Sequence, residues 1–179
     1  MIIGLCGKMG SGKDAVAALL TMRGFQRLAF ADALRREVEK EIAGGHFDDQ
    51  LDAGDLCAER GKLIAEVWAK PTTPRMRTIL QNFGMIRREQ VPGYWVKKVR
   101  RNAARFPYAV ISDVRFADEA AICDQVWRVE RPGAGGGTGS EHVSEMIPFH
   151  ADRVIVNDGT LERLARRVCD GLNELTAAA

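Results

Sequence analysis

The chain has 179 residues, which is enough for one well-filled hydrophobic core and too few for two ordinary domains. Apolar residues make up 46% of the sequence and charged residues 28%, which argues against extended disorder, a collagen-like repeat or a disulfide-rich miniature. The 26 Lys and Arg residues nearly balance the 24 Asp and Glu residues, so the small net charge favours small ligands over nucleic acid as partners.

No apolar run approaches the roughly 20 residues that cross a bilayer, and Met1 leads directly into an apolar stretch without a signal-type segment. We therefore expect a cytoplasmic protein without a membrane partner, in the host cytoplasm if a phage encodes it. The four cysteines form no C-x-x-C pair and have apolar neighbours, which predicts buried, reduced thiols. They are Cys6, Cys57, Cys123 and Cys169.

The first part of the chain alternates between strand and helix patterns. An apolar run at Ile2–Cys6 predicts a strand, and from Asp14 onward the apolar residues recur at helical spacing. A second strand is expected at 26–30, followed by a helix rich in Arg and Glu at 31–42.

A helical region of about 44–105 is expected next. Its first part, 46–59, is acidic and weakly periodic, which predicts a connection or a short helix. Helical periodicity covers 60–69, stops at two prolines, resumes around Leu80 and returns at 94–104. We expect these helices to form one insertion into a single domain.

The rest of the chain returns to strands. Continuous apolar runs at 108–112 and 126–129 predict fully buried strands, and 153–156 predicts a fifth strand. An amphipathic helix is expected from Leu161 onward. Strands that alternate with helices predict an α/β fold, in which a five-stranded parallel sheet carries helices on both faces.

One motif has the spacing of a phosphate-binding loop, G-x-x-x-x-G-K. It consists of Gly7, Lys8, Met9, Gly10, Ser11, Gly12 and Lys13, followed by Asp14. Glycines allow the backbone amides to approach an anion, and the start of a helix adds positive potential. The strand before the motif and the helix after it favour this P-loop over a glycine-rich turn with a solvated lysine.

The last two residues of this motif carry its charge. Lys13 would neutralise the β- and γ-phosphates of ATP. Asp14 stands where a Ser or Thr hydroxyl normally reaches Mg²⁺. Its carboxylate could hold the ion directly or through water, although it would also repel the triphosphate.

Asp113 follows an expected buried strand, at the edge where open α/β sheets bind ligands. It either binds Mg²⁺ or substrate, or it caps a helix. Arg115 and Glu119 follow within seven residues, and this cluster favours a functional site.

Arginines hold phosphate bidentately and neutralise charge during phosphoryl transfer. The candidates are Arg35, Arg75, Arg77, Arg115, Arg128 and Arg131. Arg75 and Arg131 stand out because each lies beside a proline that breaks the local pattern. Arg131 opens a glycine-rich segment, about 131–146, which also contains His142 and Glu145. We expect a lid there rather than a linker, since phosphoryl transfer from ATP must exclude water.

An ordinary amphipathic helix explains the basic stretch 87–105. Trp95, Val99 and Ala103 recur every four residues and would bury one face of a helix, which leaves the basic face solvated. Nucleic-acid binding is the weaker alternative. The three histidines lack metal-ligand spacing, so a zinc site is not expected.

Together these motifs resemble the phage-type deoxynucleoside monophosphate kinases, a branch of the P-loop nucleoside monophosphate kinases. The resemblance spans most of the chain. It rests on G-K-D at 12–14, F-A-D-A-L-R at 30–35, L-Q-N-F-G at 80–84, Y-W-V at 94–96, I-S-D-V-R-F at 111–116, R-P at 131–132, H-V-S-E at 142–145 and N-D-G-T-L at 157–161.

This resemblance implies that the protein transfers the γ-phosphate of ATP, with Mg²⁺, to a deoxynucleoside monophosphate. It implies that residues 7–14 hold the ATP phosphates and that Asn157 and Gly159 lie near the adenine. The catalytic candidates are Lys13, Arg115 and Arg131, and the metal candidates are Asp14 and Asp113. The substrate-binding candidates are Asp32, Arg35, Arg75, Gln81, Trp95 and Asp113.

Two rival functions remain open at this stage. The acceptor could be another phosphorylated small molecule, such as dephospho-coenzyme A or phosphomevalonate, because the G-K-D variant also occurs in phosphomevalonate kinases. The chain could also be a module that binds ATP without catalysing transfer, as the missing hydroxyl at Asp14 would permit. The motifs leave open whether the chain forms a homodimer.

Overall fold

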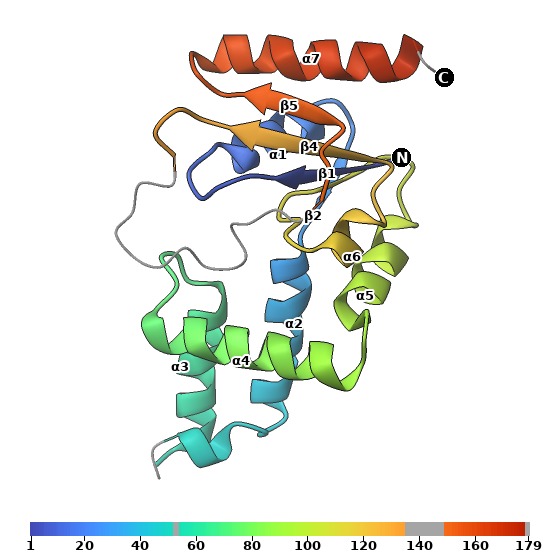
Figure 1. Cartoon of the computed structure of the whole chain (residues 1–179). Coiled ribbons are helices and arrows are strands. Elements are labelled where there is room, and N and C mark those ends of the chain that lie inside the picture. The colour runs from blue at the N-terminus through green and yellow to red at the C-terminus, as the bar shows by residue number, and fades with distance from the viewer. Residues whose placement is uncertain (52–53, 135–148, 178–179) are drawn as a thin grey trace. The chain divides into compact units, whose positions relative to one another are not determined.

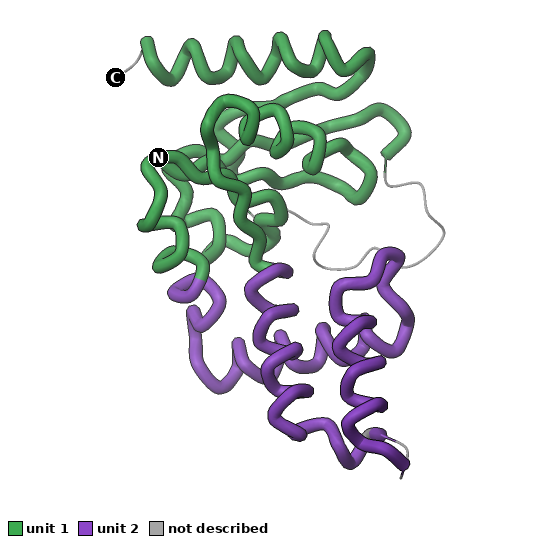
Figure 2. Tube along the Cα trace, turned by 180° about the vertical axis from the view of Figure 1, so that it is seen from behind, with its two compact units in different colours: residues 1–30, 99–179 green, residues 31–98 purple. Residues whose placement is uncertain are grey.

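The computed structural model describes residues 1–51, 54–134 and 149–177. Two compact units divide the chain: one comprises residues 1–30 and 99–179, and the other comprises residues 31–98 (Figure 2). The predicted boundaries of the helical insertion, about 44–105, stay a prediction.

The first unit is built on a five-stranded parallel sheet in the order β2-β3-β1-β4-β5 (Figure 1). The strands are β1 Ile2–Cys6, β2 Gln26–Leu28, β3 Ala109–Ile111, β4 Gln125–Glu130 and β5 Arg153–Val156. The five parallel strands expected from the sequence are therefore all present. Because β1 lies between β3 and β4, the loop after β1 leaves the middle of the sheet, where neighbouring strand ends can contribute to one site.

One face of this sheet is covered by α1, Lys13–Thr21, and α7, Leu161–Ala177 (Figure 1). Ile3 and Leu5 of β1 point to this face and are completely buried. On the opposite face, Gly4 lies so close to the segment after α6, Ala117–Ala120, that a Cβ atom would stand 2.6 Å from Cys123 Sγ. Both faces are thus packed, as the continuous apolar runs of the strands require.

The second unit is helical. It contains most of α2, Phe30–Ala43, the 3-10 turn η1, Asp48–Gln50, and α3, Leu56–Trp68. It also contains α4, Pro74–Gln90, and the first half of α5, Tyr94–Ala103. Its core is an apolar cluster of Val38, Ile42, Leu63, Val67, Met76, Ile79 and Leu80. This unit has its own hydrophobic core.

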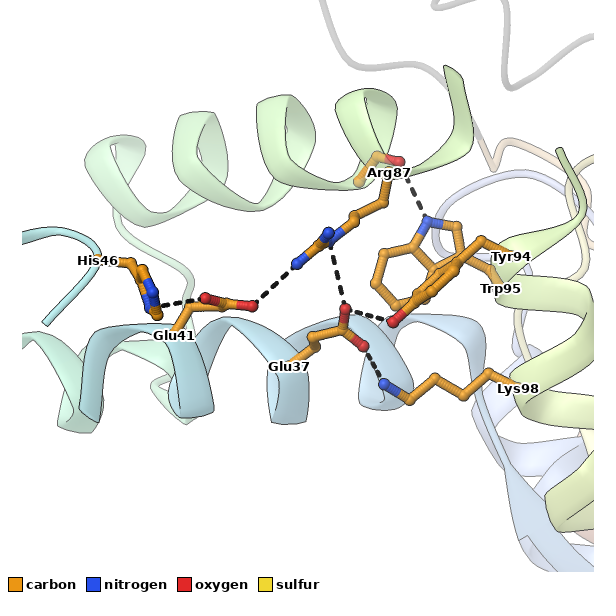
Figure 3. A network of polar contacts seen from close by, with 8 residues as sticks. Glu37, Glu41, His46, Arg87, Tyr94, Trp95 and Lys98 are labelled. Carbon is orange, nitrogen blue, oxygen red and sulfur yellow. Dashed lines mark hydrogen bonds and ion pairs between the residues drawn. The ribbon is translucent and has the colours of Figure 1, made fainter. Parts of the chain in front are cut away.

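A polar network centred on Glu37 joins α2, α4 and α5 in the helical unit (Figure 3). Glu37 is 7% exposed, accepts a hydrogen bond from Tyr94 at 2.6 Å, and forms ion pairs with Lys98 and Arg87. Burial alone would raise the pKa of Glu37, but the hydrogen bonds from Lys98 and Tyr94 and the nearby positive charges hold it below its ordinary value. Arg87 also binds Glu41 at 2.9 Å. Glu37 is therefore a paired, charged group inside the helical unit.

Two boundaries, the start of α3 and the end of β2, differ from the sequence expectation. Helix α3 begins at Leu56 because the side chain of Asp55 accepts hydrogen bonds from the backbone of Cys57 and Ala58. Strand β2 ends at Leu28 rather than at residue 30, since Phe30 already begins α2. The acidic stretch 46–59 therefore holds η1 and the first turn of α3.

The thiol prediction is partly wrong. Cys6 is buried and Cys123 and Cys169 are partly buried, but Cys57 is exposed in the first turn of α3. All four cysteines are free thiols. Burial, more than any neighbouring charge, raises the pKa of Cys123 to about 12, so this thiol stays protonated.

The apolar stripe predicted for the basic stretch 87–105 lies on α5. Trp95, Val99 and Ala103 are all at most 5% exposed, which confirms the buried stripe on α5. Within residues 1–51, 54–134 and 149–177, no helix is long and apolar enough to span a membrane.

Candidate phosphate-binding site

The loop between β1 and α1 requires glycine at three positions. Gly7, Gly10 and Gly12 have φ values of +138°, +78° and +101°, a region that residues with side chains rarely adopt. Two of them also lack space for a side chain. A Cβ atom would lie 2.3 Å from the Val129 carbonyl oxygen at Gly7, and 2.3 Å from the Asn157 amide nitrogen at Gly12. The glycines of the predicted P-loop are therefore required by its backbone.

Lys13 is the first residue of α1, and its ammonium group lies over this loop. Nζ donates hydrogen bonds to the carbonyl oxygens of Gly7 at 2.7 Å and Lys8 at 2.8 Å. Burial lowers the pKa of Lys13, and the positive charge of Arg115 lowers it further. The lysine is thus held where an anion bound to the loop amides would be adjacent to it.

A cavity of about 370 Å³ adjoins the loop, within the size range of small-molecule sites. It is lined by Gly7, Lys8, Ser11, Arg128, Val129, Glu130, Arg131 and Ala134. Two polar atoms in its wall, Ser11 Oγ and Arg128 Nε, are buried and have no hydrogen-bond partner in the described part of the chain. Such atoms typically cost about 1–3 kcal/mol each, so the cavity is suited to a polar, anionic ligand.

Asp113 lies at the end of β3, where the sequence predicted it, and it makes a capping contact. Its carboxylate accepts a hydrogen bond at 2.8 Å from the backbone N–H of Phe30, the first residue of α2. This supports the capping alternative, although the helix it caps begins 83 residues earlier in the chain rather than directly after the strand. Its predicted roles toward metal and substrate stay predictions.

Glu119 holds the backbone of the loop that carries Arg115. The Glu119 carboxylate is 3% exposed and accepts hydrogen bonds from the backbone N–H groups of Arg115 at 2.9 Å and Phe116 at 3.3 Å. The Arg115 residue itself is exposed, and its charge acts on Lys13. Glu119 therefore supports the backbone of the loop that carries Arg115.

The residues present are compatible with Mg²⁺ brought in by a nucleotide. No group of three or more His, Cys, Asp or Glu side chains that could hold a metal occurs among residues 1–51, 54–134 and 149–177. Mg²⁺ commonly uses only one or two protein carboxylates together with substrate phosphates. Asp14, exposed in the first turn of α1, and Asp113 are the candidate carboxylates on this unit.

Asn157 connects the end of β5 to the loop. Its side-chain amide donates a hydrogen bond to the carbonyl oxygen of Ser11 at 2.9 Å, and its backbone N–H donates to Glu130 at 2.6 Å. The structure thus gives Asn157 a bracing role. The predicted position of Asn157 and Gly159 near an adenine stays a prediction.

The remaining predicted substrate residues lie in the helical unit. Asp32 is in the first turn of α2, and Arg75 and Gln81 are exposed on α4. Arg35 donates hydrogen bonds to the Val67 carbonyl oxygen and to Thr72 Oγ1, so it ties the end of α3 to the following connection. Trp95 is 5% exposed and donates to Gly84 at 3.1 Å, which makes it a packed residue of this unit. Their roles toward a substrate stay predictions.

The predicted lid is only partly described. Arg131 is exposed and lines the cavity, as does Ala134. Residues 135–148, with His142 and Glu145, lie outside the described residues. Arg128, one of the six candidate arginines, also lines the cavity, although no proline or glycine marks its place within β4 in the sequence.

No protein-family model matches the chain. A dephospho-CoA kinase from Geobacter metallireducens is 26% identical over an alignment of 191 positions, which covers 94% of this chain and 93% of that protein.

Two solved structures are similar over almost the full length. TT1252 from Thermus thermophilus is 25% identical with a TM-score of 0.57, and covers 98% of this chain and 97% of its own. A dephospho-CoA kinase from Campylobacter jejuni is 12% identical with a TM-score of 0.56, and covers 97% and 96%. The chain thus has the α/β fold of P-loop kinases, with strand order 2-3-1-4-5, which confirms the predicted fold class.

Proposed function

We propose that this protein is an ATP-dependent kinase that phosphorylates a nucleotide-like small molecule, with dephospho-coenzyme A as the first acceptor to test. The observation that carries the proposal is the glycine-dependent loop, with Lys13 held over it, beside a cavity in which two buried polar atoms have no partner among the described residues. The full-length similarity to a curated dephospho-CoA kinase supports the choice of acceptor.

In this proposal the protein acts by positioning and electrostatics. The amides of the loop bind the phosphates of ATP, and Lys13 neutralises charge on the transferring group. Arg115 and Arg131 stabilise the charge that spreads over its oxygens. When bound, Mg²⁺ would neutralise phosphate charge, and Asp14 or Asp113 would hold it.

A second acceptor class, the deoxynucleoside monophosphates, is favoured by the motifs at 30–35, 111–116 and 157–161. The two classes differ in the atom that attacks ATP. A monophosphate offers a phosphate oxygen that carries no proton, whereas dephospho-coenzyme A offers a sugar hydroxyl, which must lose its proton during transfer. Only the hydroxyl acceptor needs a general base.

Asp32 and Asp113 are the two acids among the substrate-binding candidates, and the Asp113 carboxylate already accepts a hydrogen bond from the backbone N–H of Phe30. Asp32, in the first turn of α2, is therefore the first candidate to accept that proton, a role that suits a carboxylate. A carboxylate facing a monophosphate would instead repel it. If the acceptor is a hydroxyl, Asp32→Asn should lower kcat about 100-fold or more with little change in KM. An Asp32→Asn variant with unchanged kcat on the preferred acceptor would exclude this role.

The deciding experiment offers the purified protein ATP and Mg²⁺ with a panel of acceptors and measures ADP release and product mass. The panel contains dephospho-coenzyme A, the deoxy- and ribonucleoside monophosphates, and phosphomevalonate. We expect the highest kcat/KM with dephospho-coenzyme A. Transfer only to deoxynucleoside monophosphates would support the second acceptor class. ATP binding without transfer to any acceptor would support a non-catalytic module and refute the kinase proposal.

A further inference from the structure

Arg128 occupies an unusual place for an arginine. It lies within β4 and pairs in register with Cys6 of β1, the residue directly before Gly7 of the loop. Residues paired in register on parallel strands point to the same face of a sheet, and Arg128 is only partly exposed. Its side chain therefore lies at the base of the loop, where it lines the cavity.

The contacts of Arg128 do not account for a guanidinium at this position. One nitrogen donates to the carbonyl oxygen of Phe149 at 3.4 Å, a long hydrogen bond, and the Cys6 thiol is a weak acceptor beside it. Nε is buried without a partner in the part of the chain that the structure describes. Buried donors are nearly always satisfied in folded proteins, so this atom is available to donate to an acceptor on a ligand.

The hydroxyl oxygen of Ser11 is a second buried polar atom at the same cavity. Ser11 is 1% exposed, and its hydroxyl has no hydrogen-bond partner among the described residues. Among the described residues, the charged side chains that line the cavity are those of Lys8, Arg128 and Arg131, against the single acid Glu130. An arginine fork and a hydroxyl, in a wall with excess positive charge, are suited to the oxygens of a phosphate group.

We propose that Arg128 is a further phosphate-contact residue of the nucleotide site, and that it binds the triphosphate together with the Ser11 hydroxyl. This inference rests on the proposed function, because it assumes that the cavity beside the loop receives the phosphates of ATP. It goes beyond that function by assigning a residue in the interior of a strand to the site.

Calorimetric binding of inorganic triphosphate tests the contact without any acceptor or turnover. Arg128→Met removes the charge and keeps the length of the side chain, and we expect it to weaken binding about tenfold or more, as for other charge-assisted hydrogen bonds. Ser11→Ala should weaken binding about fivefold. Because the hydroxyl has no partner in residues 1–51, 54–134 and 149–177, Ser11→Ala should not lower the melting temperature of the unliganded protein, whereas loss of a structural hydrogen bond would.

Arg153→Met is the matched control. It removes the same charge from the neighbouring strand β5, where Arg153 pairs with Glu174 away from the cavity-lining residues. Its triphosphate affinity should stay within about twofold of the unmodified protein. If Arg128→Met does not fold, Arg128→Lys replaces it and should bind triphosphate at least about threefold more weakly, because a lysine lacks the planar fork.

The outcomes separate the two proposals. If the unmodified protein binds triphosphate and the Arg128 and Ser11 variants bind it equally well, this inference is wrong and the proposed kinase stands. If the unmodified protein does not bind triphosphate, both fail. Selective loss in the Arg128 and Ser11 variants, with affinity retained in Arg153→Met, supports the contact.

Discussion

Replacement of Lys13 by alanine is the most direct test of the loop as a catalytic element. The ammonium group donates to two loop carbonyl oxygens at 2.7 and 2.8 Å. A phosphate oxygen bound in the same loop would lie at a similar distance of about 3 Å. Two unit charges at that distance interact by about 5 kcal/mol at an effective dielectric constant of about 20.

Only the part of this interaction that strengthens in the transition state accelerates transfer. Loss of one preorganised charge stabiliser in other enzymes costs about 2.7–4 kcal/mol, which corresponds to about 100- to 1,000-fold in kcat. We therefore expect Lys13→Ala to lower kcat at least about 100-fold at saturating ATP and acceptor.

The assay measures ADP release by purified protein, with a thermal melt to show that the variant is folded. Lys97→Ala is the control, because it removes the same positive charge from an exposed position on α5. This control should keep kcat within about twofold of the unmodified protein. A folded Lys13→Ala variant with near-normal turnover would refute the electrostatic argument.

Three further predictions follow from the structure. In steady-state kinetics, Arg131→Ala should lower kcat more than it raises KM, because the contact of Arg131 with the transferring phosphoryl group strengthens as charge develops. A change in KM alone would contradict this. Gly7→Ala should abolish ATP binding in calorimetry, because its Cβ would lie 2.3 Å from the Val129 carbonyl oxygen at a φ of +138°; retained binding would argue against a rigid loop. Glu37→Gln should destabilise the protein by about 2 kcal/mol at pH 7, since Lys98 and Arg87 both lose their ion pair with Glu37 and Arg87 keeps only its pair with Glu41 among the described residues. Because the folded-state pKa of Glu37 is lowered, this stability is present above the unfolded-state pKa and disappears as the pH falls through the folded-state pKa. The difference in melting temperature between Glu37→Gln and the unmodified protein should therefore shrink in acid.

The parts of the fold that depend on local patterns could be predicted from the sequence. The five strands follow from short apolar runs, and the loop follows from glycine and lysine at a characteristic spacing. Helix capping by Asp113 was one of the two predicted alternatives, but the identity of the helix, α2, could not be predicted because the contact joins residues 83 positions apart. Helix α6 has four residues, too few for a helical period to be visible.

The exposure of Cys57 could not be predicted either, and Arg128 could be predicted only as one of six candidate arginines. Cys57 has apolar neighbours in sequence, but the Asp55 cap places it in an exposed first turn of α3. Arg128 reads as one polar residue in an apolar strand. Its place beside the loop appears only when the register of β1 and β4 is known.

The hydrogen bond from Asn157 to Ser11 means that the octapeptide 7–14 is not a self-sufficient module. Its shape depends on a residue 146 positions downstream, and Gly12 leaves room for that amide. A fragment that stopped before β5 would contain every residue of the motif but would lack Asn157, whose hydrogen bond to Ser11 stabilises the loop. Grafting these eight residues onto another strand–helix junction should therefore transfer little affinity for phosphate unless an equivalent amide is supplied.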